Sequence, residues 1–248
     1  MATIAICTPH GGLVDPRYYR GITVMQTSCP QHRFIFVEVD TQIIGKARNM
    51  LIEMALLQDP KPDVVWFVDN DVLIPPTAGE LVDLALNMGV VSGVYYARRP
   101  PYTPQIYLAA TEPEFVGKYW PEINMPENGI WPKDAVGAGL LCIRTDILVQ
   151  LQEMWTPRFG ACASLLQANG YEDVANIVQG LSPWFEFLDK KGEDLYFCER
   201  LKLLGYKVWV NYDIRAQHLT VIPIDRTHFE YLVANNLIHY EDGGVRNG

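Results

Sequence analysis

The N-terminal part of the chain alternates short apolar runs with segments of helical periodicity. This alternation predicts strands at 3–8, 33–39, 63–68 and 90–96, with helices at 15–29, 45–58 and 77–88 between them. Strands joined through a helix normally run parallel in one sheet. The run Asp63–Val68 is almost entirely apolar, as in a central strand covered on both faces. We therefore expect an α/β fold with a mostly parallel central sheet, in which ligands bind beyond the carboxyl ends of the strands.

The second half of the chain is less regular. Proline and aromatic residues dominate 98–133, which indicates loops and short antiparallel strands. Further strands are predicted at 137–144, 207–211 and 214–218, and helices at 145–154 and 193–204. Residues 155–183 are poorly periodic and are expected to form a lid or a small helical insertion. Because neither a repeat nor a linker interrupts the pattern, we expect residues 1–248 to form a single domain.

Composition argues against several classes of protein. The formal net charge is −9, opposite in sign to a surface built for a nucleic-acid backbone, although a local basic patch remains compatible with it. No run approaches the ~20 apolar residues of a membrane span, and no signal peptide is recognisable at the N-terminus. The five cysteines are scattered and contain no C-x-x-C pair, which indicates reduced thiols rather than a zinc site. We expect a cytoplasmic protein without an integral membrane segment, in the host cytoplasm if a phage encodes it.

Two carboxylates follow the most apolar predicted strand, in the sequence Asp69-Asn70-Asp71. Residues two apart in extended chain point to the same side, so these carboxylates repel unless a positive charge lies between them. A divalent cation with a phosphate is the natural partner, because such cations prefer oxygen ligands. The alternative is a plain turn, since Asp and Asn are common turn residues.

A second acidic pair, Glu193-Asp194, opens the helix predicted at 193–204. Carboxylates are stabilised at a helix N-terminus, and capping alone would explain one of them. A carboxylate held there beside a cleft could also serve as a general base. His218 follows on a short strand, and a lone histidine is more often structural than a ligand.

Taken in order, these motifs resemble the GT-A glycosyltransferases, in particular the family-2-like nucleotide-sugar transferases. The matching segments are Thr3–Pro9 as the first nucleotide-binding strand, Lys46-Ala47-Arg48-Asn49 as the Ala-Arg-Asn helix start, Asp69-Asn70-Asp71 as the D-x-D motif, Gly137-Ala138-Gly139 as the small-residue strand, Gly192-Glu193-Asp194 with Phe197-Cys198 as the Glu-Asp motif, and His218 as the late histidine. The resemblance implies a GT-A (Rossmann-like) three-layer sandwich. It also implies a nucleotide-binding half at 1–97 and an acceptor-binding half at 98–248.

The resemblance further implies how a donor would be held. Asp71 and His218 would ligate Mn²⁺ or Mg²⁺, and Asp69 would contact the metal, the ribose or the donor sugar. The remaining donor-binding residues implied in this way are Thr8, Pro9, His10, Asp40, Arg48, Asn49, Asn70, Gly137 and Gly139. Asp40 is the weaker assignment, because relatives carry Asp-Asp-Gly-Ser after this strand and this chain does not.

The implied reaction moves a sugar from a nucleoside-diphosphate sugar, UDP-sugar favoured over GDP-sugar, to an acceptor hydroxyl. Asp194, or less readily Glu193, would deprotonate the acceptor in an inverting displacement. A nucleotidyltransferase is one alternative, but the loop Thr8–Gly12 lacks the basic residue that it needs. A non-catalytic nucleotide-sugar-binding protein is the other. The acceptor stays open between a saccharide, a lipid-linked sugar, a protein and a modified DNA base, because the segment Tyr95–Tyr102 is aromatic and basic and suits either sugars or nucleic acid.

Overall fold

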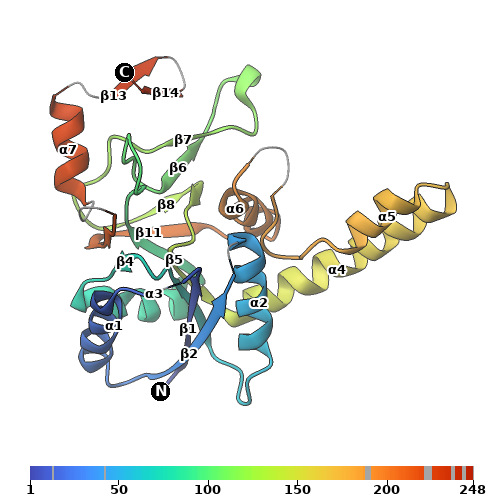
Figure 1. Ribbon diagram of the computed structural model, residues 1–248, viewed down its shortest axis with the longest axis horizontal. Helices are drawn as coiled ribbons and strands as arrows, with labels where there is room; N and C mark the ends of the chain where they lie inside the picture. The colour runs from blue at the N-terminus through green and yellow to red at the C-terminus, as the bar shows by residue number, and fades with distance from the viewer. Residues whose placement is uncertain are drawn as a thin grey trace.

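The chain folds around one central sheet of seven strands, shown in Figure 1. The computed structural model describes residues 1–12, 14–41, 43–187, 191–220, 225–235, 238–241 and 244–247. In spatial order the strands are β2 (Arg33–Asp40), β1 (Thr3–His10), β3 (Val64–Val68), β10 (Leu140–Arg144), β5 (Val90–Val94), β11 (Val208–Arg215) and β8 (Ile130–Lys133). Five of them run parallel, while β10 and the edge strand β8 are antiparallel to their neighbours. The prediction of a mostly parallel α/β sheet is confirmed.

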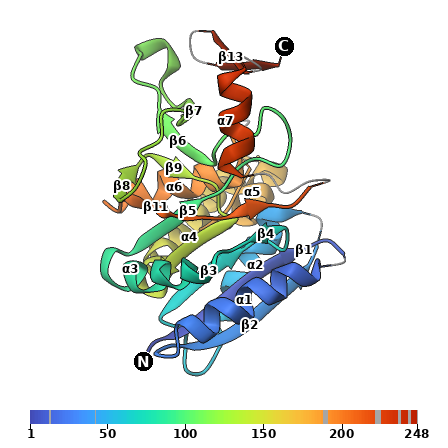
Figure 2. The same ribbon diagram turned by 90° about the vertical axis from the view of Figure 1, so that its left-hand side faces the viewer.

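Helices cover both faces of the sheet and form a three-layer sandwich, as Figures 1 and 2 show. On one face lie α1 (Pro16–Ser28) and α3 (Glu80–Met88), and on the other lie α2 (Ile44–Leu56), α4 (Thr145–Ala168) and α6 (Glu193–Leu203). Strand side chains alternate between the two cores. In β3, Trp66 packs with α1 and α3, whereas Phe67 packs with α2 and α6. Both are fully buried, as the continuous apolar run predicts.

Local sequence signals set most helix ends. Asp15 caps α1 by accepting a hydrogen bond from the Arg17 N–H at 2.8 Å. Gly205 follows α6 with φ +82°, a conformation that glycine adopts without strain. The helix expected to begin at Thr77 instead begins at Glu80, because Pro76–Gly79 form a 3₁₀ turn and no side chain caps α3.

The second half of the chain adds short strands above the sheet. A three-stranded antiparallel sheet contains β7 (Tyr119–Pro121), β6 (Ile106–Ala109) and β9 (Ala135–Val136), in agreement with the prediction for the proline-rich segment. Two further strands pair beside the main sheet, namely β4 (Val72–Leu73) and β12 (Gln217–His218). The C-terminal region contains α7 (Arg226–Ala234), β13 (Ile238–Glu241) and β14 (Gly244–Asn247).

A helical hairpin projects from the molecule, on the right of Figure 1. It consists of the distal part of α4 and of α5 (Glu172–Gln179). The helix predicted to end near Met154 continues through Pro157 to Ala168. Its distal part is mostly exposed, so it lacks the apolar stripe by which a helix is recognised in a sequence. In the described part of the chain, α4 included, no helix has the length and apolar character needed to cross a membrane.

Two glycines allow a matched test of the packing between β5, β10 and β11. A Cβ at Gly93 would lie 2.9 Å from the carbonyl oxygen of Ile214 and 2.8 Å from Leu140, so Gly93→Ala is expected to destabilise the protein by about 1–3 kcal/mol. A Cβ at Gly160, in the exposed part of α4, would meet no atom within 4 Å. Gly160→Ala should therefore stabilise by roughly 0.5–1 kcal/mol. Urea unfolding of both variants measures the difference, and equal stability of the two would contradict the packing described.

Candidate active site

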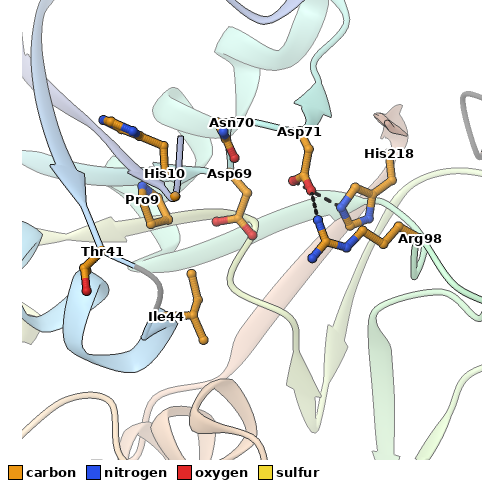
Figure 3. Close-up of a pocket in the computed structure, with 10 residues that line it drawn as sticks. Pro9, His10, Thr41, Ile44, Asp69, Asn70, Asp71, Arg98 and His218 are labelled. Atoms are coloured by element: carbon orange, nitrogen blue, oxygen red, sulfur yellow. Dashed lines mark hydrogen bonds and ion pairs between the residues drawn. The ribbon is translucent and has the colours of Figure 1, made fainter. Parts of the chain in front are cut away.

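A cavity of about 600 Å³ opens at the carboxyl ends of β1 and β3. This is the edge at which the sequence places the ligand. It is lined by Pro9, His10, Gly11, Thr41, Ile44, Asp69, Asn70, Asp71, Arg98 and His218. Figure 3 shows that Asp71, Arg98 and His218 point toward one another. Within the described chain the buried Nδ1 of His10 has no hydrogen-bond partner.

The segment Asp69-Asn70-Asp71 is a turn as well as a pair of carboxylates. The Asp69 N–H donates to the Gly139 carbonyl at 3.0 Å, and the Val72 N–H donates to the Asp69 carbonyl at 2.9 Å. The pairing of β4 with β12 places His218 opposite Val72, which brings a residue from the end of the chain to this turn. The segment is therefore a turn that presents the two carboxylates at the sheet edge, and cation binding by them stays a prediction.

Asp71 lies beside two basic side chains. Its Oδ2 accepts a hydrogen bond from Nη1 of Arg98 at 2.7 Å, and its Oδ1 lies 3.2 Å from Nε2 of His218. Burial alone would raise the pKa of Asp71, but His218 and Arg98 outweigh it, and the pKa is lowered. Burial opposes the charged form of His218, yet the hydrogen bond and the charge of Asp71 raise its pKa.

The orientation of His218 suits a metal ligand. Its Nδ1 lies 2.5 Å from the carbonyl oxygen of Tyr96. If Nδ1 donates there, the neutral ring carries its lone pair on Nε2, on the side that faces Asp71. Asp71 and His218 thus offer one oxygen and one nitrogen donor to a divalent cation. No group of three or more His, Cys, Asp or Glu side chains converges on a metal position within the described ranges, and Asp69 is paired elsewhere.

Asp69 is held by Arg48, which also holds Glu193. Nη2 of Arg48 donates to both carboxylate oxygens of Asp69, at 3.2 and 3.1 Å, and Nη1 donates to Oε1 of Glu193. The side chain of Arg48 is only 4% exposed. Burial alone would lower the pKa of Arg48, but the charges of Asp69 and Glu193 raise it, so the guanidinium stays charged. This arginine therefore joins the Asp69 turn to the first residue of α6.

A second cavity of about 290 Å³ adjoins the first and contains Asp194. The two cavities share Ile44, Asp69, Arg98 and His218. Oδ1 of Asp194 accepts a hydrogen bond from the Leu195 N–H at 2.8 Å. Burial, followed by the charge of Glu193, raises the pKa of Asp194 to about 6. A carboxylate with such a pKa is suited to accept a proton near neutral pH.

Gly137 and Gly139, which are predicted to lie beside the donor sugar, line neither cavity. A Cβ at Gly137 would lie 2.2 Å from the Tyr95 hydroxyl, and a Cβ at Gly139 would lie 2.7 Å from Oδ2 of Asp69. The Gly139 N–H donates to the Tyr95 hydroxyl at 2.9 Å. Both glycines therefore let Tyr95 and Asp69 approach the backbone closely.

Three other residues predicted to bind the donor do not line either cavity. The hydroxyl of Thr8 is hydrogen-bonded to that of Tyr18. The amide of Asn49 is engaged on both sides by the backbone of Phe185, at 2.7 and 3.0 Å. Asp40 is exposed at the end of β2. Their predicted contacts with a donor remain predictions.

Several cavity residues were not assigned to the donor site from the sequence, among them Thr41, Ile44, Arg98 and Gln105. Arg98 is the most informative of these, because it contacts Asp71 directly. Its signal in the sequence is its position four residues after β5, whose carboxyl end meets the same sheet edge as β3. The sequence marked the segment 95–102 as aromatic and basic but assigned it to the acceptor.

No family model and no curated protein matches this chain. Among solved structures, A197 from STIV is 17% identical and covers 89% of this chain and 86% of its own, with a TM-score of 0.54. GalNAc-T7, crystallised with UDP, GalNAc and Mn²⁺, is 11% identical with a TM-score of 0.49, and the match covers 88% of this chain but only 44% of GalNAc-T7. A glycosyltransferase involved in glycosylation of the major capsid of PBCV-1 is 15% identical over 84% of this chain and 92% of its own, with a TM-score of 0.35.

The fold is GT-A-like. This conclusion concerns the fold alone, because the identity to A197 is below 25%, and nothing is inferred from the two matches with TM-scores below 0.5. It agrees with the order of strands in the sheet and with the position of the Asp69 turn at its carboxyl edge.

The Arg48 bridge can be tested through stability. Arg48→Met leaves Glu193 buried without its partner, which is expected to lower the free energy of unfolding by roughly 3 kcal/mol. The double variant Arg48→Met/Glu193→Gln removes the unpaired charge and should recover part of that loss. Urea unfolding of the single and double variants gives the comparison. Wild-type stability in Arg48→Met would show that the bridge does not hold these segments together.

Proposed function

We propose that this protein is a metal-dependent glycosyltransferase that moves a sugar from a nucleoside-diphosphate sugar, UDP-sugar favoured, to an acceptor hydroxyl. The observation that carries the proposal is the continuity of two cavities across Asp69, with the Asp71–His218 pair in one and Asp194 in the other. A donor bound in the first cavity would present its sugar toward the second. In this proposal residues 1–97 mainly bind the nucleotide, while residues 98–248 supply His218, Asp194 and the acceptor site.

The carboxylate of Asp71 and the imidazole of His218 fit a divalent cation in part. Asp71 and His218 would hold Mn²⁺ or Mg²⁺, and Asp69, fixed by Arg48, would face the ribose or the sugar. When bound, such an ion supplies positive charge to the departing diphosphate. Pro9, His10 and Gly11, which line the first cavity, would contact the nucleoside.

Asp194 is the proposed general base. Glu193 is engaged by Arg48, whereas Asp194 lines the second cavity and has the pKa of a group that accepts protons near neutral pH. Removal of the acceptor proton by Asp194 is expected to accompany attack of the hydroxyl on the anomeric carbon, with inversion of configuration. Hydrolysis of the donor in the presence of metal separates this proposal from a non-catalytic nucleotide-sugar-binding protein.

The first test concerns the metal dependence of nucleotide binding. Without a cation, a diphosphate loses the positive charge that would bridge it to Asp71, so EDTA is expected to weaken UDP binding at least about tenfold relative to Mn²⁺. Asp71→Asn should abolish most of the difference between the two conditions. Isothermal titration calorimetry measures both, with Asp173→Asn on exposed α5 as a control of equal charge change. Equal UDP affinity in EDTA and Mn²⁺ would rule out the metal site.

The second test concerns the base. Asp194→Asn should lower turnover by about 10²–10⁴-fold, the usual contribution of a general base, and leave UDP affinity unchanged. Because the carboxylate is the active form and its pKa is about 6, wild-type turnover should rise as the pH increases through 6 and then level off. The variant should lose that rise. Glu193→Gln should reduce thermal stability more than turnover, and a product that keeps the donor's anomeric configuration would contradict the inverting mechanism.

A further inference from the structure

The backbone around Arg98 is fixed by hydrogen bonds, whereas the side chain of Arg98 is largely exposed. The loop that carries it is closed by backbone hydrogen bonds from Ala97 to Thr103 at 2.8 Å and from Gln105 to Tyr95 at 2.9 Å. The side chain of Arg98 is nevertheless 56% exposed. Rotation of this side chain therefore changes its partner without moving the loop.

We propose that Arg98 neutralises Asp71 in the metal-free protein and exchanges this carboxylate for the diphosphate of the donor when a divalent cation is bound. This inference rests on the proposed function and adds a residue to it. It assigns to Arg98 two successive partners, a carboxylate of the protein and a phosphate of the ligand.

The first step follows from competition for one carboxylate. Oδ2 of Asp71 accepts its hydrogen bond from Arg98, and Oδ1 lies beside His218. A cation ligated by Asp71 and His218 binds the same carboxylate, so it neutralises the charge that attracts the guanidinium and repels the guanidinium itself. The pair is exposed on the arginine side, and exposed ion pairs contribute little, which makes Arg98 easy to displace.

The second step follows from where a displaced guanidinium would remain. Arg98 lines both cavities, and it is the single Arg or Lys among the described residues that line the first. Arg48, by contrast, is buried and already occupied by Asp69 and Glu193. A diphosphate in the first cavity therefore has Arg98 as its nearest available guanidinium, whose planar donors match phosphate oxygens.

The next residue provides a matched control. Arg99 has the same charge and lies on the same loop, but it lines only the second cavity, and no ion pair of its guanidinium is found among the described residues. Replacing Arg99 thus changes the net charge near the site as much as replacing Arg98 does. Only Arg98 is expected to affect both the metal and the diphosphate.

The experiment measures two affinities by calorimetry in wild type, Arg98→Gln and Arg99→Gln. The first is for Mn²⁺ alone, and the second is for UDP at saturating Mn²⁺. Arg98→Gln should bind Mn²⁺ up to about fivefold more tightly, because the internal competitor is gone. It should bind UDP roughly tenfold more weakly, because a charge-assisted hydrogen bond is lost. Arg99→Gln should leave the Mn²⁺ affinity at the wild-type value.

These opposite changes separate the inference from its alternatives. Unchanged or weaker Mn²⁺ binding in Arg98→Gln would overturn the competition, and unchanged UDP binding would overturn the exchange. Equal effects of Arg98→Gln and Arg99→Gln would mean that both affinity changes come from the loss of one positive charge near the site. That result would overturn the assignment to Arg98. If wild type binds UDP in a metal-dependent way and Arg98→Gln has no effect, this inference alone is wrong. If wild type binds neither Mn²⁺ nor UDP, the proposed function is wrong as well. Melting curves show whether each variant is folded.

Discussion

A single buried arginine joins the segments on which the site depends. Arg48, in the first turns of α2, donates to Asp69 after β3 and to Glu193 at the start of α6, which are 21 and 145 residues away in the sequence. A guanidinium removed from water without partners would cost several kcal/mol, so burial of Arg48 requires both carboxylates to be in place. The position of α6, and with it that of Asp194, is thereby coupled to the turn that presents Asp71. One interaction aligns the two cavities.

The elements that the sequence predicts well are those whose pattern is set by burial. The strands β1 and β3 and the helix α1 lie where periodicity and the Asp15 cap indicate. The direction of β10 could not be predicted in the same way. Leu140–Ile143 are buried on both faces, and a parallel strand shows the same pattern, so burial does not reveal the strand direction. The antiparallel pairing of β10 between β3 and β5 depends on contacts far away in the chain. The distal part of α4 was missed because exposure removes the apolar stripe.

In the candidate site, too, some residues could be predicted from the local sequence and others depend on contacts far away in the chain. Asp69 and Asp71 could be assigned because they follow a buried strand at the ligand-binding edge, and this needs only the local sequence. The exchangeable role of Arg98 depends on the path of a loop closed by the pairing of residues far outside any motif. The side chains of Thr8 and Asn49 look available in the sequence, but Tyr18 and the backbone of Phe185 engage them in the fold. Motif spacing identifies which residues reach the edge, and packing decides which of them remain free.

The adjacent carboxylates of α6 show how one helix start serves two purposes. Glu193 is paired with Arg48, and its charge raises the pKa of Asp194, while the charge of Arg48 lowers it. The proton affinity of Asp194 thus depends on the same ion pair that fixes its position. If Glu193 were neutral, Asp194 would lose a repelling neighbour, its pKa would fall, and it would become a weaker base. The pairing of Arg48 with Glu193 therefore affects catalysis as well as stability, although neither side chain needs to touch the acceptor.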